Sequence, residues 1–284
     1  MDSSLNELQE VSGTMLITLF ARAKESLSKN PILFDKKAVE IIDRLIPDFV
    51  NSPNPIHRKI LRGSYNSKLA ATMALRSRYF DRCVGDFIKR NPRGTVVNIG
   101  CGLDTRFERI DNGTIHWFDI DLPEVIELRR KYLTESERQV FIGCSILERG
   151  WIDEVKADRP YLFVAEGVFM YLEEKDLKAL FAMISDNFPH SELVCEVTNR
   201  FWVDKMKSRY MRFKFKHQLG MSGGATFTFG VPHSRYFEEW DDRYKYLDEW
   251  TYFDEKDRKL GWYNVFSFVE LLRKVQWTVR YLIE

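Results

Sequence analysis

Two glycines and two acids follow neighbouring apolar runs of the chain. Gly100 and Gly102 come directly after the run 95–99, and glycines let a backbone turn sharply and approach a ligand closely. Asp119 and Asp121 follow about 20 residues later, the spacing at which an acid can accept hydrogen bonds from a ribose. A glycine pair alone is a weak signal. With a preceding strand and these acids, it indicates a site for a nucleoside cofactor.

The residues inside the glycine turn distinguish between two such cofactors. A dinucleotide-binding turn has a third small residue three positions after its second glycine, where a helix receives the pyrophosphate. This chain has Thr105 there, and the preceding Asp104 adds a negative charge. That charge disfavours a pyrophosphate but suits S-adenosylmethionine, which carries an ammonium and a sulfonium group and no phosphate. The turn therefore favours a methyl donor over NAD, and an NAD-dependent oxidoreductase is the less favoured alternative.

The elements that must position these residues alternate between strand and helix. Apolar runs of strand length lie at 95–99, 115–119, 139–143, 161–165 and 191–197. Helical patterns separate two pairs of them, at 123–132 and 173–187. This order implies βαβ units and an α/β fold, with a mostly parallel sheet and helices on both faces. Ligands of such sheets bind beyond the carboxyl ends of the strands, where the glycines and acids stand.

The regions on either side of this core differ from it. Residues 14–28, 35–50 and 67–90 have helical patterns and predict an N-terminal helical extension. Residues 201–266 are crowded with aromatic side chains, and we expect a cap over the sheet edge that lines a substrate pocket. A surface subdomain that packs its own aromatic rings is the alternative interpretation.

The chain end completes the expected division of one domain. A helix at 264–275 and a strand at 277–283 close the fold. We expect one domain with four parts. Residues 1–92 form the N-terminal helical part and residues 93–198 the cofactor-binding core. Residues 199–262 form the substrate cap inserted after the fifth strand, and residues 263–284 the closing helix and strand.

Composition restricts the class of protein further. The 43 basic and 42 acidic residues give a net charge of +1, which argues against a nucleic-acid partner or an acidic tail. The hydrophobic fraction of 44% supports a sizeable core. No apolar run approaches the ~20 residues of a membrane-spanning helix, and the first residues lack the features of a signal peptide. The four cysteines have no metal-binding spacing. We expect a cytoplasmic protein with reduced thiols and no metal.

Three segments carry a resemblance to a known family. They are Val96–Arg106, Phe118–Val125 and Ala165–Leu172. Together they resemble the leucine carboxyl methyltransferase family, which includes polyketide-type O-methyltransferases. Leu75–Asp81 looks like the upstream arginine motif of that family, and Phe20–Ser26 is a looser match. The resemblance implies a Rossmann-like class I methyltransferase that depends on S-adenosylmethionine.

The resemblance also implies which residues hold the methionine part of the cofactor. Arg76 would pair with its carboxylate, a contact that suits the planar guanidinium group, and Arg22 is a second candidate. Gly100 would let the backbone approach the methionine portion, and Gly102 would shape the turn. Glu166, at the end of the fourth strand, would lie near the same part of the cofactor.

The ribose and adenine contacts follow from the same resemblance. Asp121 would accept hydrogen bonds from the ribose hydroxyls, with Asp119 as the alternate. The family usually has an Asp-Leu pair near the adenine after the third strand, whereas this chain has Ser145 and Ile146. A serine still accepts a hydrogen bond but brings no charge, and we keep both residues as adenine contacts.

The predicted reaction is methyl transfer to an oxygen atom of a small molecule. A carboxylate acceptor is already ionised at neutral pH and needs no base, whereas a phenol or alcohol benefits from one. The candidates for such a base are Tyr171, His190, His217 and His233, and each histidine also suits a plain surface position. Ser145 motivates an alternative, a non-catalytic protein that keeps the nucleoside site. The sequence does not predict the acceptor or the oligomeric state.

Several of the charged residues also have a purely structural interpretation. Arg76 suits an exposed helix surface, and Glu166 suits an ion pair at the end of a strand. Asp104 can cap a helix with Arg106 as its surface partner. The basic run 129–131 is typical of a solvated helix face.

Overall fold

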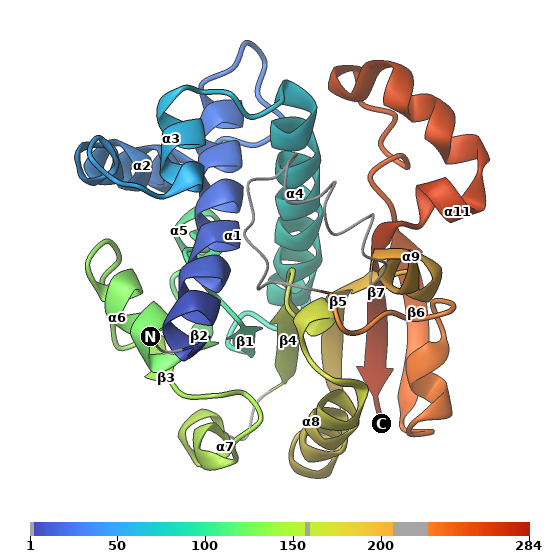
Figure 1. Ribbon diagram of the computed structural model, residues 1–284. Coiled ribbons are helices and arrows are strands. Elements are labelled where there is room, and N and C mark those ends of the chain that lie inside the picture. Colours follow the sequence, from blue (N-terminus) through green and yellow to red (C-terminus); the bar gives the residue numbers. More distant parts are fainter. Residues whose placement is uncertain (1–2, 157–159, 207–226) are drawn as a thin grey trace.

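The computed structural model describes residues 3–156, 160–206 and 227–284, and its centre is one mixed sheet (Figure 1). The strand order is β3-β2-β1-β4-β5-β7-β6. The strands are β1 (Thr95–Ile99), β2 (His116–Asp121), β3 (Gln139–Gly143), β4 (Tyr161–Ala165), β5 (Ser191–Thr198), β6 (Tyr244–Trp250) and β7 (Gln276–Ile283). Strands β1 to β5 pair in parallel, whereas β7 is antiparallel to both β5 and β6. The order reverses between β1 and β4, which makes the carboxyl ends of these strands the expected ligand site.

Helices cover both faces of the sheet, with α1 and α4 on one side and α7 and α8 on the other (Figure 1). The α-helices are α1 (Ser3–Ser26), α2 (Lys36–Phe49), α3 (Pro55–Leu61), α4 (Ser67–Arg90), α5 (Arg106–Ile110), α6 (Pro123–Arg130), α7 (Gly150–Val155), α8 (Glu174–Asn187), α9 (Arg200–Met206) and α11 (Glu270–Arg273). Three 3-10 segments are η1 (Phe169–Tyr171), η2 (Tyr236–Glu239) and η3 (Arg258–Phe268). The predicted α/β class with an N-terminal helical extension is confirmed.

Local chemistry explains where several helices begin. The side chain of Asp35 accepts a hydrogen bond from the Ala38 N–H and caps α2. Asn66 caps α4 in the same way through the Lys68 N–H. Pro123 occupies the first turn of α6, where its missing N–H costs no helical hydrogen bond.

Strand β6 was not predicted from the sequence. It lies within the range 199–262 that we assigned to the cap, but it pairs with β7 at the edge of the sheet. Its end residues Tyr244 and Trp250 are buried while those between them are half-buried or exposed, and a register shift separates Tyr246 from Asp248. The helix expected at 264–275 is instead the end of η3 followed by the short α11, and Val269 between them has an extended backbone with φ −117° and ψ 107°.

The buried side chains form a core on both faces of the sheet. One cluster includes Trp151 and Phe181 from α7 and α8, and another includes Phe80 and Phe87 from α4. Some aromatic rings of the expected cap belong to this core, because Phe237 packs 4.5 Å from the Phe181 ring. The cysteines are free, and all except the half-buried Cys144 are buried.

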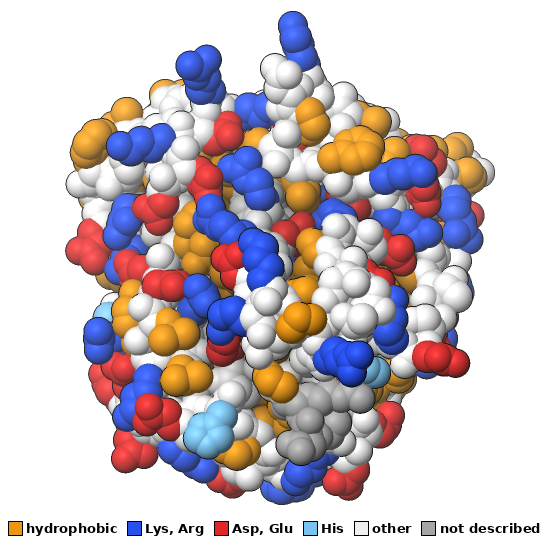
Figure 2. All heavy atoms as spheres, turned by 180° about the vertical axis from the view of Figure 1, so that it is seen from behind, with side chains coloured by type: hydrophobic (Ala, Val, Ile, Leu, Met, Phe, Trp, Pro, Cys, Tyr) orange, Lys and Arg blue, Asp and Glu red, His pale blue; other side chains and the backbone are white. Residues whose placement is uncertain are grey.

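The described parts of the chain contain neither a candidate membrane span nor a candidate metal site. None of their helices has the length and apolarity of a membrane-spanning segment. Nor do these residues bring three His, Cys, Asp or Glu side chains together as a metal site. The face in Figure 2 carries acidic and basic side chains interspersed with apolar ones.

Candidate functional site

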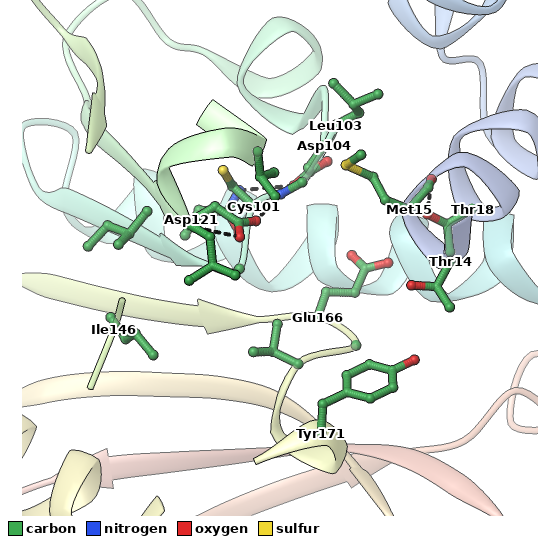
Figure 3. A pocket seen from close by; sticks show the side chains of 18 of the residues that line it. Thr14, Met15, Thr18, Cys101, Leu103, Asp104, Asp121, Ile146, Glu166 and Tyr171 are labelled. Atoms are coloured by element: carbon green, nitrogen blue, oxygen red, sulfur yellow. Dashed lines mark hydrogen bonds between the residues drawn. The ribbon is translucent and has the colours of Figure 1, made fainter. Parts of the chain in front are cut away.

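A cavity of about 400 Å³ opens where the carboxyl ends of β1, β2 and β4 meet (Figure 3). Ten residues singled out from the sequence line it, namely Arg22, Arg76, Gly100, Gly102, Asp104, Asp121, Ser145, Ile146, Glu166 and Tyr171. In Figure 3, Ile146 lies at one end and Tyr171 toward the other, with Asp121 and Glu166 between them. The fold therefore brings most of the predicted site residues into one space.

The glycine turn after β1 has a backbone that other residues rarely adopt. Gly100 has φ 62° and Gly102 has φ 49°, both in the left-handed region that favours glycine. A Cβ at Gly100 would lie 2.5 Å from the Val168 side chain, and one at Gly102 would lie 3.1 Å from Met15. Any side chain here would displace its neighbours, so glycine keeps the floor of the cavity open.

Asp121 presents its carboxylate at this turn. Its Oδ2 accepts a hydrogen bond from the Gly102 N–H at 2.7 Å, and its Oδ1 accepts one from the Leu122 N–H at 2.8 Å. Burial raises the pKa of Asp121, against the lowering effect of these two backbone donors. These two backbone N–H groups hold the carboxylate in place at the lining of the cavity, and among the described residues no side chain donates to it.

Asp119 does not line the cavity and is fully buried. Its carboxylate accepts hydrogen bonds from Arg129 Nη2 at 2.7 Å, and also from Asn98, Trp117 and Gln139. This inward position uses up the acceptor capacity of the group. Of the two acids at the end of β2, the geometry favours Asp121 as the one available to a ligand.

Two arginines that we interpreted as surface residues are buried. Arg129 is 1% exposed, and its Nη1 donates to the carbonyl oxygens of Gly102 at 3.1 Å and Asp104 at 2.7 Å. The interpretation of 129–131 as a solvated face is therefore wrong for Arg129, because its partners come from the glycine turn and β2. Arg106 is also 1% exposed and contacts Asp81, Asp104 and Glu166.

Arg76 and Glu166 meet at the middle of the cavity. Arg76, on α4, is buried rather than exposed, and its Nε donates to Glu166 Oε1 at 2.8 Å. The other carboxylate oxygen of Glu166 accepts from Arg106 Nη2. Burial alone would raise the pKa of Glu166, but the two guanidinium groups hold it below its usual value. The site thus contains a carboxylate that stays ionised beside an arginine.

Arg22 reaches the same cavity from α1. Its Nε donates to Asp35 Oδ2 at 3.0 Å, and its Nη2 donates to the Leu103 carbonyl oxygen at 2.9 Å. The guanidinium therefore already has two partners, one of them in the glycine turn. Arg22 ties α1 to the turn, whereas Arg76 has a nitrogen, Nη2, that makes no hydrogen bond within the described residues.

The end of the cavity near β3 is mostly apolar. Ile146 and Leu122 line it together with Val125, Cys144 and Ser145. The Ser145 hydroxyl accepts a hydrogen bond from the Leu147 N–H at 3.3 Å. No carboxylate takes the place of the serine, so this end offers apolar contact and one hydroxyl group.

The candidate bases lie in different places. Tyr171 lines the cavity, and burial raises its pKa to about 12, so the phenol is neutral at physiological pH. His233 does not line it and pairs instead with Glu239 at 2.9 Å on the surface. His190 lies in the exposed turn between α8 and β5 and is not part of the lining. His217 lies outside the described residues.

Other residues of α1 besides Arg22, and β7, also line the cavity and were not predicted from the sequence. Thr14, Met15 and Thr18 line the cavity from α1, and Gln276 lines it from the start of β7. Figure 3 shows the α1 residues facing Glu166 and Asp104 across the cavity. The signal in the sequence was the spacing of Thr14, Thr18 and Arg22 along one helix face.

The family and relatives of the chain agree with this geometry. A family model described as leucine carboxyl methyltransferase matches residues 15–185. The tetracenomycin polyketide synthesis O-methyltransferase TcmP of Streptomyces glaucescens is 31% identical over 248 residues, covering 87% of this chain and 85% of that protein. The S-adenosyl-L-methionine-dependent methyltransferase dpfgK of Gibberella zeae is 30% identical over 290 residues, covering 98% and 93%.

Solved structures support the fold. The crystal structure of a DUF574 family protein from Streptomyces avermitilis superimposes with a TM-score of 0.56, covering 85% of this chain and 96% of that one at 11% identity. At that identity the likeness concerns the fold alone. The family model, by contrast, matches more than half of the chain, and two relatives of 30% identity or more span most of it. The resemblance seen in the sequence is thereby confirmed, and the chain belongs to the leucine carboxyl methyltransferase family.

Proposed function

We propose that the chain binds S-adenosylmethionine in the cavity and methylates an oxygen atom of a small molecule. The observation that carries the proposal is that Arg76, the glycine turn and Asp121 line one space at the carboxyl ends of β1, β2 and β4. Dependence on S-adenosylmethionine agrees with the family and with the relative from Gibberella zeae. The residues present fit the cofactor part by part.

The methionine part fits the middle of the cavity. Its carboxylate suits Arg76 Nη2, which has no partner in the described structure. Its ammonium suits Glu166, whose pKa is held below the usual range and which is therefore negative at neutral pH. The open floor at Gly100 lets the backbone approach the ligand, since a Cβ there would occupy that space.

The adenosine part fits the end near β2 and β3. Asp121 suits the ribose hydroxyls, because a ligand hydroxyl can add a hydrogen bond to an acceptor that a carboxylate leaves free. Ile146 and Leu122 supply apolar contact for a flat base, and Ser145 supplies a hydroxyl group. We retain Ser145 and Ile146 as the adenine contacts.

The bound cofactor supplies a methyl group that its sulfonium already activates. The protein must then hold the acceptor oxygen in line with this methyl group and keep water away. Orientation of the two reactants should therefore account for most of the rate acceleration. Tyr171 is neutral at physiological pH, so it lines the cavity and can hydrogen-bond to a ligand rather than act as a base. The reaction forms an oxygen–carbon bond and breaks the sulfur–methyl bond, and any proton of the acceptor leaves to solvent or to a base.

The choice of oxygen and of a small acceptor rests on two supports. The relative TcmP is named an O-methyltransferase of tetracenomycin polyketide synthesis. In this chain, Phe227 from the expected cap approaches the cavity, with its ring 5.4 Å from that of Tyr171. We propose that the cap residues within 199–262 hold the acceptor there. A non-catalytic protein that keeps the cofactor site is the alternative, and family membership disfavours an NAD-dependent oxidoreductase.

A transfer assay with isotope-labelled methyl donor tests the proposal. The purified chain is incubated with phenols, small carboxylic acids and peptides that end in a free carboxylate. We expect label in a phenol or small-acid product, and less of it with Asp121→Ala at a donor concentration below saturation. Mild base releases the label from a methyl ester but not from an aryl ether, which separates the two oxygen acceptors. Label on nitrogen only, or on the peptides only, contradicts the proposed acceptor class. No label from any acceptor while the cofactor binds favours the non-catalytic alternative.

A further inference from the structure

The guanidinium of Arg76 donates a hydrogen bond to a buried carboxylate that does not line the cavity. Glu196, on β5, is 1% exposed, and its Oε2 accepts a hydrogen bond from Arg76 Nη1 at 2.8 Å. The other oxygen, Oε1, accepts one from the Tyr252 hydroxyl at 2.7 Å. Tyr252 follows β6, so the three residues come from distant parts of the chain: α4, β5 and the segment after β6.

We propose that Tyr252 and Glu196 are positioning residues that aim Arg76 at the carboxylate of the cofactor. This inference rests on the proposed function. With Nε bound to Glu166 and Nη1 bound to Glu196, the guanidinium plane is fixed on two of its three nitrogens. Nη2 is the nitrogen left without a partner among the residues described, on a side chain that lines the cavity. Tyr252 and Glu196 themselves do not appear in the lining.

The chemistry of the two partners supports a fixed arrangement. Burial and the adjacent carboxylate hold the pKa of Tyr252 well above its ordinary value, so its hydroxyl remains a donor. Burial raises the pKa of Glu196, and the neighbouring Arg76 and Tyr252 oppose that rise. Tyr252 and Arg76 therefore bind opposite oxygens of one buried carboxylate and hold it between them. Without the Tyr252 donor, the buried carboxylate would keep Arg76 as its hydrogen-bond partner among the described residues.

The arrangement reduces the cost of binding. An unrestrained arginine loses side-chain conformational entropy when it is ordered, and a restrained one has lost it before the ligand arrives. The gain applies only to a ligand with a group that Nη2 can bind. Tyr252 and Glu196 should therefore affect ligands that contain the methionine carboxylate and leave bare adenosine derivatives unaffected.

The test compares two ligands on matched variants by calorimetric titration. S-adenosylhomocysteine has the amino-acid carboxylate, whereas 5′-methylthioadenosine has the same nucleoside and thioether without it. We expect Tyr252→Phe to weaken S-adenosylhomocysteine binding about ten-fold, because a less restrained Arg76 must be ordered when the ligand binds, and to leave the affinity for 5′-methylthioadenosine unchanged. Glu196→Gln should show the same selectivity with a larger loss.

A matched control removes a different buried hydroxyl. Tyr244→Phe deletes the hydrogen bond from the Tyr244 hydroxyl to the Phe181 carbonyl oxygen, at 2.9 Å in the core, and should change neither affinity. Equal losses for both ligands in Tyr252→Phe, or no loss for either, overturn the inference and leave the proposed function intact. Failure of the unmodified chain to bind S-adenosylhomocysteine overturns the proposed function, and this inference with it.

Discussion

Asp119 and Arg129 form an ion pair in the interior, with Asp119 Oδ2 and Arg129 Nη2 2.7 Å apart. The same guanidinium donates to the carbonyl oxygens of Gly102 and Asp104. One arginine of α6 thus fastens the end of β2 to the glycine turn after β1. The pair supports the floor of the site without being part of its lining.

Arg129→Met should destabilise the fold, because it leaves the buried Asp119 without its cationic partner. We expect the free energy of unfolding to fall by about 3–5 kcal/mol, as measured by urea denaturation. Arg130→Met is the control, since Arg130 is half exposed and pairs with Glu135 at 2.9 Å. It should cost at most about 1 kcal/mol. Equal losses in the two variants would contradict the structural role of Arg129.

Gly100→Ala should damage both the fold and the site. Alanine would keep the unfavourable φ of 62° and place its Cβ 2.5 Å from Val168, which should cost about 2–4 kcal/mol and abolish binding of S-adenosylhomocysteine. Gly113→Ala separates the two causes, because Gly113 has φ 80° and no atom within 4 Å of a new Cβ. It should cost about 1 kcal/mol and leave binding unchanged. Normal ligand binding by Gly100→Ala would refute the close approach at the turn.

Tyr171→Phe should retain methyl transfer. Since burial raises the pKa of Tyr171 to about 12, the phenolate is scarce at neutral pH, and a general base is not what the variant loses. We expect the rate to change by less than about ten-fold and the pH–rate profile to keep its shape. A loss of about 100-fold or more, together with the disappearance of a basic limb from the profile, would identify Tyr171 as a base.

Asp35 should make folding sensitive to acid. Burial alone would raise its pKa, but Arg22 and Arg109 lower it below the ordinary 3.8. The folded state therefore binds its proton less readily than the unfolded state. The contribution to stability is complete above pH 3.8 and is lost as the pH falls through the lowered value.

Asp35→Asn tests this assignment by denaturation at several pH values. The free energy of unfolding of the variant should be about 3 kcal/mol lower at neutral pH, because Arg22 and Arg109 lose a buried carboxylate partner. On acidification, the variant should lose less of its stability than the unmodified chain does. Asp43→Asn, at an exposed position on the same helix, should match the unmodified chain at every pH. Parallel pH curves for Asp35→Asn and the unmodified chain would contradict the assignment.

The parallel strands were predictable because they are buried on both faces. Runs 95–99, 139–143 and 161–165 have the bounds of β1, β3 and β4 in the structure, since a strand covered on both sides is a continuous apolar run. Strand β6 was not predictable in this way. It lies at the sheet edge, where a half-exposed strand mixes aromatic and charged residues, and its composition resembles that of the expected cap.

The site was predictable in its outline but not in its partners. The glycine turn and an acid at the end of β2 followed from their spacing, but spacing does not tell Asp119 from Asp121. The structure separates them, because Arg129 and three other donors surround only Asp119. Arg129 itself stands in a basic run, and nothing local shows that its partners come from other elements. Contacts between distant segments depend on how the elements pack, which a linear pattern does not contain.

Calorimetric titration with S-adenosylhomocysteine tests the central claim, that an adenosine-containing ligand is held by the glycine turn and Asp121. We expect saturable binding at one site by the unmodified chain, and a loss of affinity of about ten-fold or more for Asp121→Ala, measured at a temperature where the variant is folded. Absence of binding by the unmodified chain, or unaltered affinity in Asp121→Ala, would contradict the account.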